Sequence, residues 1–239
     1  MGIDLTDHLA LYYFTSDKFS VYQFITYMFM HGNFMHIFFN MFALWMFGNV
    51  LENYWGSNRF FVYYMITGIG AALTHMGFTA FELMKINNAV QAFGNTPSAE
   101  SFMQVVKDFF PGYEQSGNIQ SFAIEWTRHP GDTSYTTQAM EYFNQLINLK
   151  RDVPVVGASG AIFGILLAFG MMFPNTLLYI YFAIPIKAKY FVIIYGLIEL
   201  FGGLQNAEGD NVAHFAHLGG MLFGFILIQY WKRNINRYQ

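Results

Sequence analysis

Long apolar runs alternate with polar segments along this chain, and the runs are long enough to cross a membrane. A spanning helix needs about 20 consecutive, mostly apolar residues. Gly32–Leu51 and Phe60–Phe81 meet this requirement without a formal charge. Backbone amides in lipid must be satisfied within their own segment, so such runs are expected to be helical. Three further spanning helices are predicted at about Ser159–Phe173, Tyr190–Leu204 and Asn211–Trp231.

Two stretches are too polar to span. Residues 1–31 are mixed, and Phe19–Met30 is predicted to be an amphipathic helix at the outer surface. Residues 82–152 are predicted to be a long external insertion, with helical spacing of apolar residues at Pro97–Phe110 and Thr136–Leu149. Between Phe173 and Tyr190, Pro174 and Pro185 predict a connection that skims the interface. The pattern as a whole predicts an all-α polytopic membrane protein with one domain over residues 1–239.

The composition agrees with a membrane environment. Of the 239 residues, 54% are hydrophobic and only 11% are charged, about half the charged fraction of a soluble domain. A net charge of -3 argues against nucleic-acid binding, which needs a basic surface. The absence of cysteine excludes disulfides and thiolate metal sites.

Basic residues in short loops predict the orientation, because they collect on the cytoplasmic side. If successive helices alternate in direction, one side gathers Arg59, Lys187, Lys189, Lys232, Arg233 and Arg237. The short loop Gln205–Asp210 on the other side has Glu208 and Asp210 and no basic residue. The first side, which includes the carboxyl terminus, is therefore predicted to be cytoplasmic.

Four polar residues stand inside predicted spans, where polar side chains are costly and are candidates for function. They are His36, Asn40, Ser159 and His217. Ser159 lies between Gly157 and Gly160, which permit a sharp transition from loop to helix. Such a transition would place Ser159 at a helix N-terminus, which favours developing negative charge. The alternative is that these glycines only allow close helix packing.

The other three polar residues also have two interpretations. His217, Gly220 and Gly224 share one helix face, so a neighbouring helix could approach the imidazole closely. His36 and Asn40 are four residues apart and also share a face, which suits two donors to an oxyanion. Each of these side chains could instead make an ordinary polar contact between helices.

Together these segments resemble the rhomboid intramembrane proteases. Residues 31–40 (HGNFMHIFFN) resemble the second-helix signature of the family, Gly157–Gly160 (GASG) its nucleophile motif, and His214–Gly224 its last-helix signature. The three occur in the order of the family and on separate predicted helices. The resemblance covers nearly the whole chain.

The resemblance implies a serine endopeptidase that cleaves transmembrane helices of other proteins. Ser159 would be the nucleophile and His217 its general base, with Phe163 packed against the imidazole. The Ser159 amide, His36 and Asn40 would form the oxyanion hole, and Gly157, Gly160 and Gly220 would support the site. No carboxylate lies near enough to His217 in sequence to be assigned to it, and His214 is interpreted as a bystander. No cofactor or metal is implied.

The same resemblance implies an integral protein of the bacterial cytoplasmic membrane, with a site that opens outward. Family members usually have a further spanning helix ahead of His36, and residues 1–31 show none. Five spans then place the amino terminus outside. A catalytically impaired protein of the same fold, which binds transmembrane clients, is the main alternative. A transporter or proton relay and a haem protein with paired histidines are weaker ones.

Overall fold

The computed structural model describes residues 4–180, 183–205 and 212–235. Asn211, Glu208, Asp210 and Arg237, which the predictions above include, lie outside these ranges. The helices α1 to α11 are, in order, Leu5–Leu9, Gln23–Thr26, Phe34–Ala43, Asn49–Trp55, Ser57–Asn95, Ala99–Phe109, Gly117–Arg128, Ser134–Arg151, Ser159–Met172, Ala188–Gln205 and His214–Ile235. Short 3₁₀ turns occupy Tyr27–Phe29 and Tyr113–Gln115, and a π-helical turn, Leu44–Gly48, joins α3 to α4.

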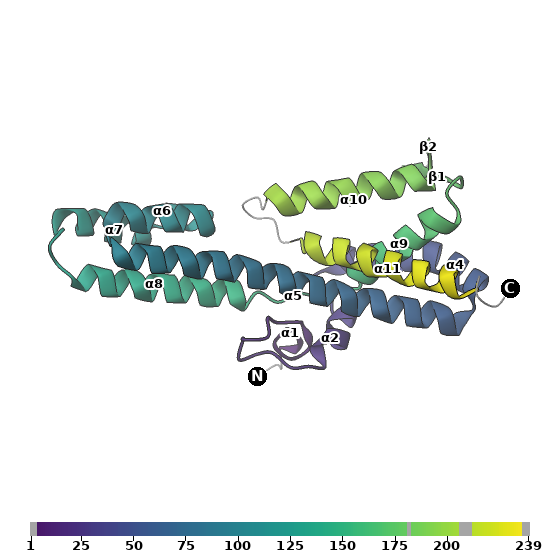
Figure 1. Cartoon of the computed structure of the whole chain (residues 1–239), viewed down its shortest axis with the longest axis horizontal. Helices are drawn as coiled ribbons and strands as arrows, with labels where there is room; N and C mark the ends of the chain where they lie inside the picture. Colours follow the sequence, from purple (N-terminus) through teal and green to yellow (C-terminus); the bar gives the residue numbers. More distant parts are fainter. Residues whose placement is uncertain (1–3, 181–182, 206–211, 236–239) are drawn as a thin grey trace.

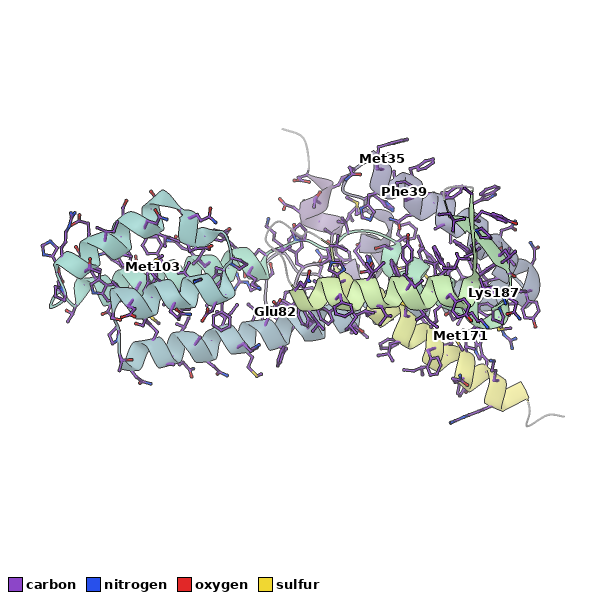
Figure 2. All side chains as sticks on the ribbon, turned by 90° about the horizontal axis from the view of Figure 1, so that it is seen from above. Met35, Phe39, Glu82, Met103, Met171 and Lys187 are labelled. Carbon is purple, nitrogen blue, oxygen red and sulfur yellow. The ribbon has the colours of Figure 1, made fainter. Side chains whose placement is uncertain are left out.

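The prediction of an all-α polytopic membrane protein is confirmed. By length and composition, three helices in the described part of the chain could cross a membrane: Phe34–Trp55, Ser57–Asn95 and Ala188–Gln205. The other two predicted spans correspond to α9, a shorter apolar helix of 14 residues, and α11, which has 22. Apolar side chains cover the outer surface of these helices. Met35 and Phe39 on α3, labelled in Figure 2, are more than half exposed.

Helix α5 is much longer than the predicted span Phe60–Phe81. Its 39 residues correspond to about 58 Å, roughly twice the thickness of a bilayer core. Figure 1 shows it running through the molecule, with α9, α10 and α11 along one half and α6, α7 and α8 along the other. Beyond Phe81 the helix continues because Leu83, Ile86 and Val90 remain buried at helical spacing.

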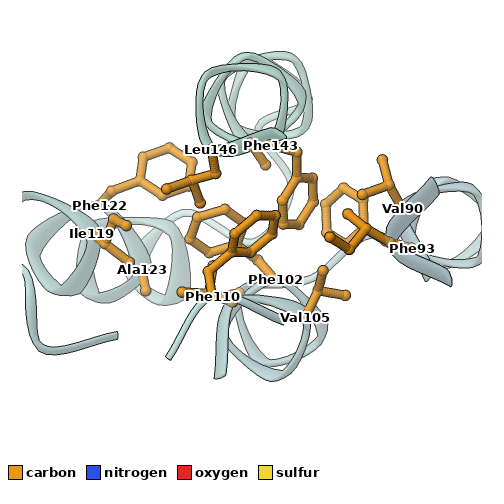
Figure 3. Packing of buried hydrophobic residues seen from close by; sticks show 14 of the residues in the cluster. Val90, Phe93, Phe102, Val105, Phe110, Ile119, Phe122, Ala123, Phe143 and Leu146 are labelled. Atoms are coloured by element: carbon orange, nitrogen blue, oxygen red, sulfur yellow. The ribbon is translucent and has the colours of Figure 1, made fainter. Parts of the chain in front are cut away.

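The second half of α5 forms a bundle with α6, α7 and α8, as Figure 3 shows. Phe102 and Phe143 are fully buried at its centre, with ring centroids 5.2 Å apart. The helices predicted at Pro97–Phe110 and Thr136–Leu149 are present as α6 and α8, but α7 was not predicted. Ser98 caps α6 by accepting a hydrogen bond from the Ser101 amide. The assignment of residues 82–152 as an external insertion of a single domain stays a prediction.

Small residues hold the helices α5, α9 and α11 together. Gly70 faces the Phe223 ring, Gly219 faces Thr74, and Gly164 lies against Thr67. Side chains at these glycines would separate the helices, so the close approach depends on their absence. The resulting three-helix core carries two of the three sequence motifs, the nucleophile motif at the start of α9 and the last-helix signature on α11.

The segment before α3 differs from the predicted amphipathic helix at Phe19–Met30. Only α2 and the following 3₁₀ turn are helical there. The reason is Gln23, which is fully buried and accepts hydrogen bonds from the amides of Tyr12 and Ser20 through Oε1. Its Nε2 donates to the carbonyls of His8 and Lys18. These bonds hold the segment as a compact loop.

The connection after α9 also has structure that was not predicted. Strand β1, Leu177–Ile180, pairs antiparallel with β2, Ile184–Lys187, so that Leu177 is opposite Lys187. Pro185 is in β2, opposite Tyr179. The hairpin leads directly into α10.

Candidate active site

A short extended segment delivers Ser159 to the first position of α9. Val155 exchanges two backbone hydrogen bonds with Leu11, each 2.9 Å long, and the Gly157 amide donates to the Tyr27 carbonyl at 2.9 Å. Gly157 has φ of +120°, a conformation that side chains rarely permit. The chain therefore turns sharply, and Ser159 begins the helix where backbone amides lack intrahelical partners.

Ser159 and His217 meet across α9 and α11. The Ser159 Oγ and the His217 Nε2 are 2.8 Å apart, within hydrogen-bonding distance. The Phe163 ring, one turn beyond Ser159, stacks on the imidazole at a centroid distance of 4.3 Å and an interplanar angle of 9°. His217 is only 8% exposed. The imidazole is thus held on its face by Phe163 and reaches the hydroxyl with its edge.

Glu199 on α10 occupies the opposite edge of the imidazole, and sequence reasoning missed it. Its Oε2 lies 2.8 Å from His217 Nδ1 and 2.7 Å from His214 Nδ1. His214, interpreted above as a bystander, is therefore part of the same network. One signal was available: Glu199 is the single charged residue in the predicted span Tyr190–Leu204. Its partner lies 18 positions away on another helix, so no local pattern indicated the contact.

Glu199, His214 and His217 each offer one ligand atom, and these atoms lie within 4.8 Å of one another. They are the residues of the site that could hold a metal ion. However, both imidazoles already contact the same carboxylate oxygen at hydrogen-bonding distances. This arrangement accounts for the cluster as a hydrogen-bonded network.

His36 and Asn40 approach from the first turns of α3, which begins after the capping side chain of Asn33. The Gly32 amide donates to His36 Nδ1 at 3.3 Å, so the Nε2 of a neutral His36 carries the hydrogen. That Nε2 lies so close to Gly157 that a Cβ there would be 2.6 Å from it. Asn40 is 5% exposed, and its Nδ2 has no hydrogen-bond partner among the described residues. Both side chains therefore have a donor to offer, and that of His36 lies beside Gly157, two residues before Ser159.

His31 lies in the loop before α3, and its ring contacts the His36 ring edge to face at 5.1 Å. Burial lowers the pKa of His31 from its ordinary value, because the charged form loses solvation. Burial therefore favours the neutral form of the His31 ring beside His36.

Comparison with known proteins identifies the family. Residues 18–96 and 133–233 match the family model described as the Rhomboid domain. The chain belongs to the rhomboid family. Each of the site residues of this rhomboid protein lies inside the matched segments, whereas α6 and α7 lie in the gap between them.

A curated relative is an uncharacterized mitochondrial rhomboid protein of Schizosaccharomyces pombe. It is 35% identical over 85 residues, which is 33% of this chain and 22% of the relative. The match thus spans about a fifth of the length of that relative. No solved structure matches the chain.

Proposed function

We propose that this rhomboid protein is an intramembrane serine endopeptidase that cleaves transmembrane segments of other membrane proteins. The observation that carries the proposal is the 2.8 Å contact between Ser159 Oγ and His217 Nε2. A nucleophile and a base within hydrogen-bonding reach, with the base oriented by a third group, are the signature of an activated serine. Membership of the family supports an intramembrane function of this kind.

In the proposed reaction His217 Nε2 takes the proton of Ser159 as Oγ bonds to the substrate carbonyl carbon. The carbonyl electron pair moves onto oxygen and gives a tetrahedral oxyanion. When the pair returns, the C–N bond breaks and His217 protonates the leaving amine. A water molecule then gives its proton to His217 and attacks the acyl-enzyme. Ser159 regains its proton as the new carboxylic acid leaves.

The developing oxyanion would be stabilised by three donors. They are the Ser159 backbone amide at the start of α9, His36 and Asn40. The unpartnered Nδ2 of Asn40 supports its part, since a buried amide without a partner is costly unless a ligand uses it. Gly157 gives His36 access to this side of Ser159, because its missing side chain leaves room for the ring. Donors placed in advance around a forming charge are usually the largest single catalytic contribution.

The substrate class follows from the surroundings. The site is formed by the first turns of α3, α9 and α11 and by Glu199 on α10. Helices α3 and α10 belong to segments long and apolar enough to cross a membrane, and α9 is a shorter apolar helix. A peptide bond in a regular helix is shielded by its own hydrogen bonds. Transmembrane segments with Gly or Pro near the membrane surface are therefore expected to be preferred. The outward-facing site and the bacterial cytoplasmic membrane belong to the same proposal.

The proposal is tested with the full chain reconstituted in liposomes and a single-span reporter protein. Wild-type protein should cleave the reporter and react with a fluorophosphonate probe, whereas Ser159→Ala and His217→Ala should do neither. Ser134→Ala and His129→Ala are matched controls, because both residues are exposed in the α5–α8 bundle. The controls should behave as wild type.

Two results would contradict the proposal. Cleavage by the Ser159→Ala variant would remove Ser159 as the nucleophile. Binding of the reporter by wild type with neither cleavage nor probe labelling would instead favour the alternative, a protein that captures transmembrane clients.

A further inference from the structure

We propose that Glu199 is the positioning residue of the general base, so that Ser159, His217 and Glu199 act together as a triad. His214 is a second contact that holds the carboxylate in place. This inference rests on the proposed function and adds an acid from α10 to the serine and histidine. It starts from the two contacts of the Glu199 carboxylate, 2.8 Å to His217 and 2.7 Å to His214.

The first step concerns the tautomer of His217. To accept the proton of Ser159, Nε2 must be unprotonated, and the ring hydrogen of the neutral imidazole must then be on Nδ1. Glu199 Oε2 lies 2.8 Å from Nδ1, where it accepts this hydrogen. The carboxylate therefore selects the tautomer in which His217 is a base toward Ser159. Without it, a buried imidazole could carry the hydrogen on either nitrogen.

The second step concerns charge. His217 becomes an imidazolium each time it removes a proton, and a buried cation is costly unless it is paired. Glu199 is 7% exposed, and its ion-pair partners among the described residues are His214 and His217. No described Lys or Arg forms an ion pair with the carboxylate, so its charge is directed at these two rings. It is placed to stabilise the protonated form of His217.

The third step concerns how the carboxylate is held. His214 donates to the same oxygen from the first residue of α11, one turn before His217. Gly202 on α10 leaves the space that the His214 ring fills, since a Cβ there would lie 2.6 Å from its Cε1. Phe163 on α9 covers the face of His217 while Glu199 contacts its edge. The base is thus fixed from two directions by different helices.

A charged residue inside a spanning helix is energetically costly and is therefore a candidate for function. Most side chains of α10 face outward, and only Ala188, Val192, Glu199 and Gly203 are buried. The single carboxylate among them points at the proposed base. Glu199 contacts Nδ1 of the imidazole, whereas Ser159 contacts Nε2. This is the placement expected of a residue that orients the base toward Ser159.

The test compares Glu199→Gln with Glu199→Asp in the reconstituted full chain, with Glu82→Gln as the matched control. Glu82 also forms an ion pair inside the molecule, at 3.2 Å to Lys150, but in the α5–α8 bundle. For Glu199→Gln we expect kcat to fall about 10²- to 10⁴-fold, as when a serine protease loses its orienting acid, with KM within about threefold of wild type. Glu199→Asp should recover part of this loss, and Glu82→Gln should leave kcat unchanged.

The pH dependence of kcat/KM separates the two roles, because loss of a purely structural residue would leave it unchanged. A neighbouring anion stabilises the imidazolium form of the base, and the Glu199→Gln substitution removes this stabilisation. The acidic limb of kcat/KM should therefore move to lower pH in Glu199→Gln and stay near wild type in Glu199→Asp. Among the described residues, further titratable groups that interact with His217 are His36 on α3, His75 on α5 and, through Glu199, His214. These three histidines are the same in both variants.

Active-site titration with the fluorophosphonate probe corrects every rate for the folded fraction. If Glu199→Gln lowers only the titratable fraction, and kcat per active site and the acidic limb are unchanged, Glu199 has a structural role and the inference is wrong. In that case wild-type cleavage and Ser159 labelling still support the proposed function. If wild-type protein neither cleaves nor labels, the proposed function fails and this inference fails with it.

Discussion

The carbonyl oxygen of Gly160 on α9 lies against the Cα of Gly220 on α11, so closely that a Cβ on Gly220 would overlap it. Ser159 directly precedes one of these glycines, and His217 lies one turn before the other. The distance between nucleophile and base therefore depends on a contact between two backbones. In a membrane, where helices gain little from the hydrophobic effect, small residues at such crossings set how near the helices come.

The first prediction is that Gly220→Ala abolishes reporter cleavage although it adds only one methyl group. The collision with Gly160 is with backbone, which cannot rotate away, so α9 and α11 must separate. Overpacking of this kind typically costs about 1–3 kcal/mol of stability. We expect a loss of at least about 10²-fold in kcat/KM, because misplacement by about 1 Å is enough for such an effect.

Gly77→Ala and Gly94→Ala on α5 are the controls, because a Cβ at either position meets nothing within 4 Å. Both should be neutral or slightly stabilising, since Ala is the better helix former. Activity and thermal unfolding in detergent are measured side by side. Gly220→Ala protein with wild-type kcat/KM would show that the two helices are not held together by this contact.

A second prediction concerns Gly157, where conformation and space both require glycine. Its φ of +120° disfavours any side chain, and a Cβ would lie 2.6 Å from His36 Nε2. Gly157→Ala should therefore displace His36 and tilt the start of α9, with a fall in kcat of about 10²-fold or more. The unstrained loop variant Gly131→Ala, which meets nothing within 4 Å, should retain full activity. Equal rates for the two variants would contradict the proposed role of His36.

Periodicity predicted the membrane helices because lipid imposes one strong requirement on them, an uncharged run of sufficient length. It placed α9 and α10 within about two residues of their observed ends. It ended this helix at Phe81, because residues 82–152 were interpreted as a polar external insertion. Beyond Phe81 the helix has another set of partners in the α5–α8 bundle. Helix α7 was missed although Ile119, Phe122, Ala123 and Trp126 have helical spacing and are buried.

Only the site residues that lie in the sequence motifs could be predicted. Ser159 and His217 are 58 positions apart, and only the resemblance to a family suggested that they meet. The proximity of Glu199 to His217 could not be read from either helix. It depends on how α10 packs against α11, and residues such as Gly202, whose missing side chain leaves room for His214, decide that packing. A lone acid in an apolar run was the available signal.

A third prediction is that Asn40→Ala slows turnover without abolishing it. Loss of one oxyanion donor typically costs about 10²–10³ in kcat, while Ser159 and His217 remain in contact. Since Asn40 Nδ2 has no partner among the described residues, its removal should break no hydrogen bond of the resting protein. Thermal stability should therefore change little. A large fall in the unfolding temperature, with kcat per active site unchanged, would mean that Asn40 serves packing instead.

The last prediction separates the α5–α8 bundle from the chemistry. Phe143 is fully buried there, against Phe93 at 5.1 Å and Phe102 at 5.2 Å. Phe143→Ala should destabilise the bundle by about 3–5 kcal/mol and speed amide hydrogen exchange in α6–α8. The exposed Ile124→Ala on α7 should not. Because Ser159 and His217 are held by α5, α9 and α11 through a different set of contacts, probe labelling should persist in both variants. Loss of labelling in Phe143→Ala alone would show that the bundle supports the site.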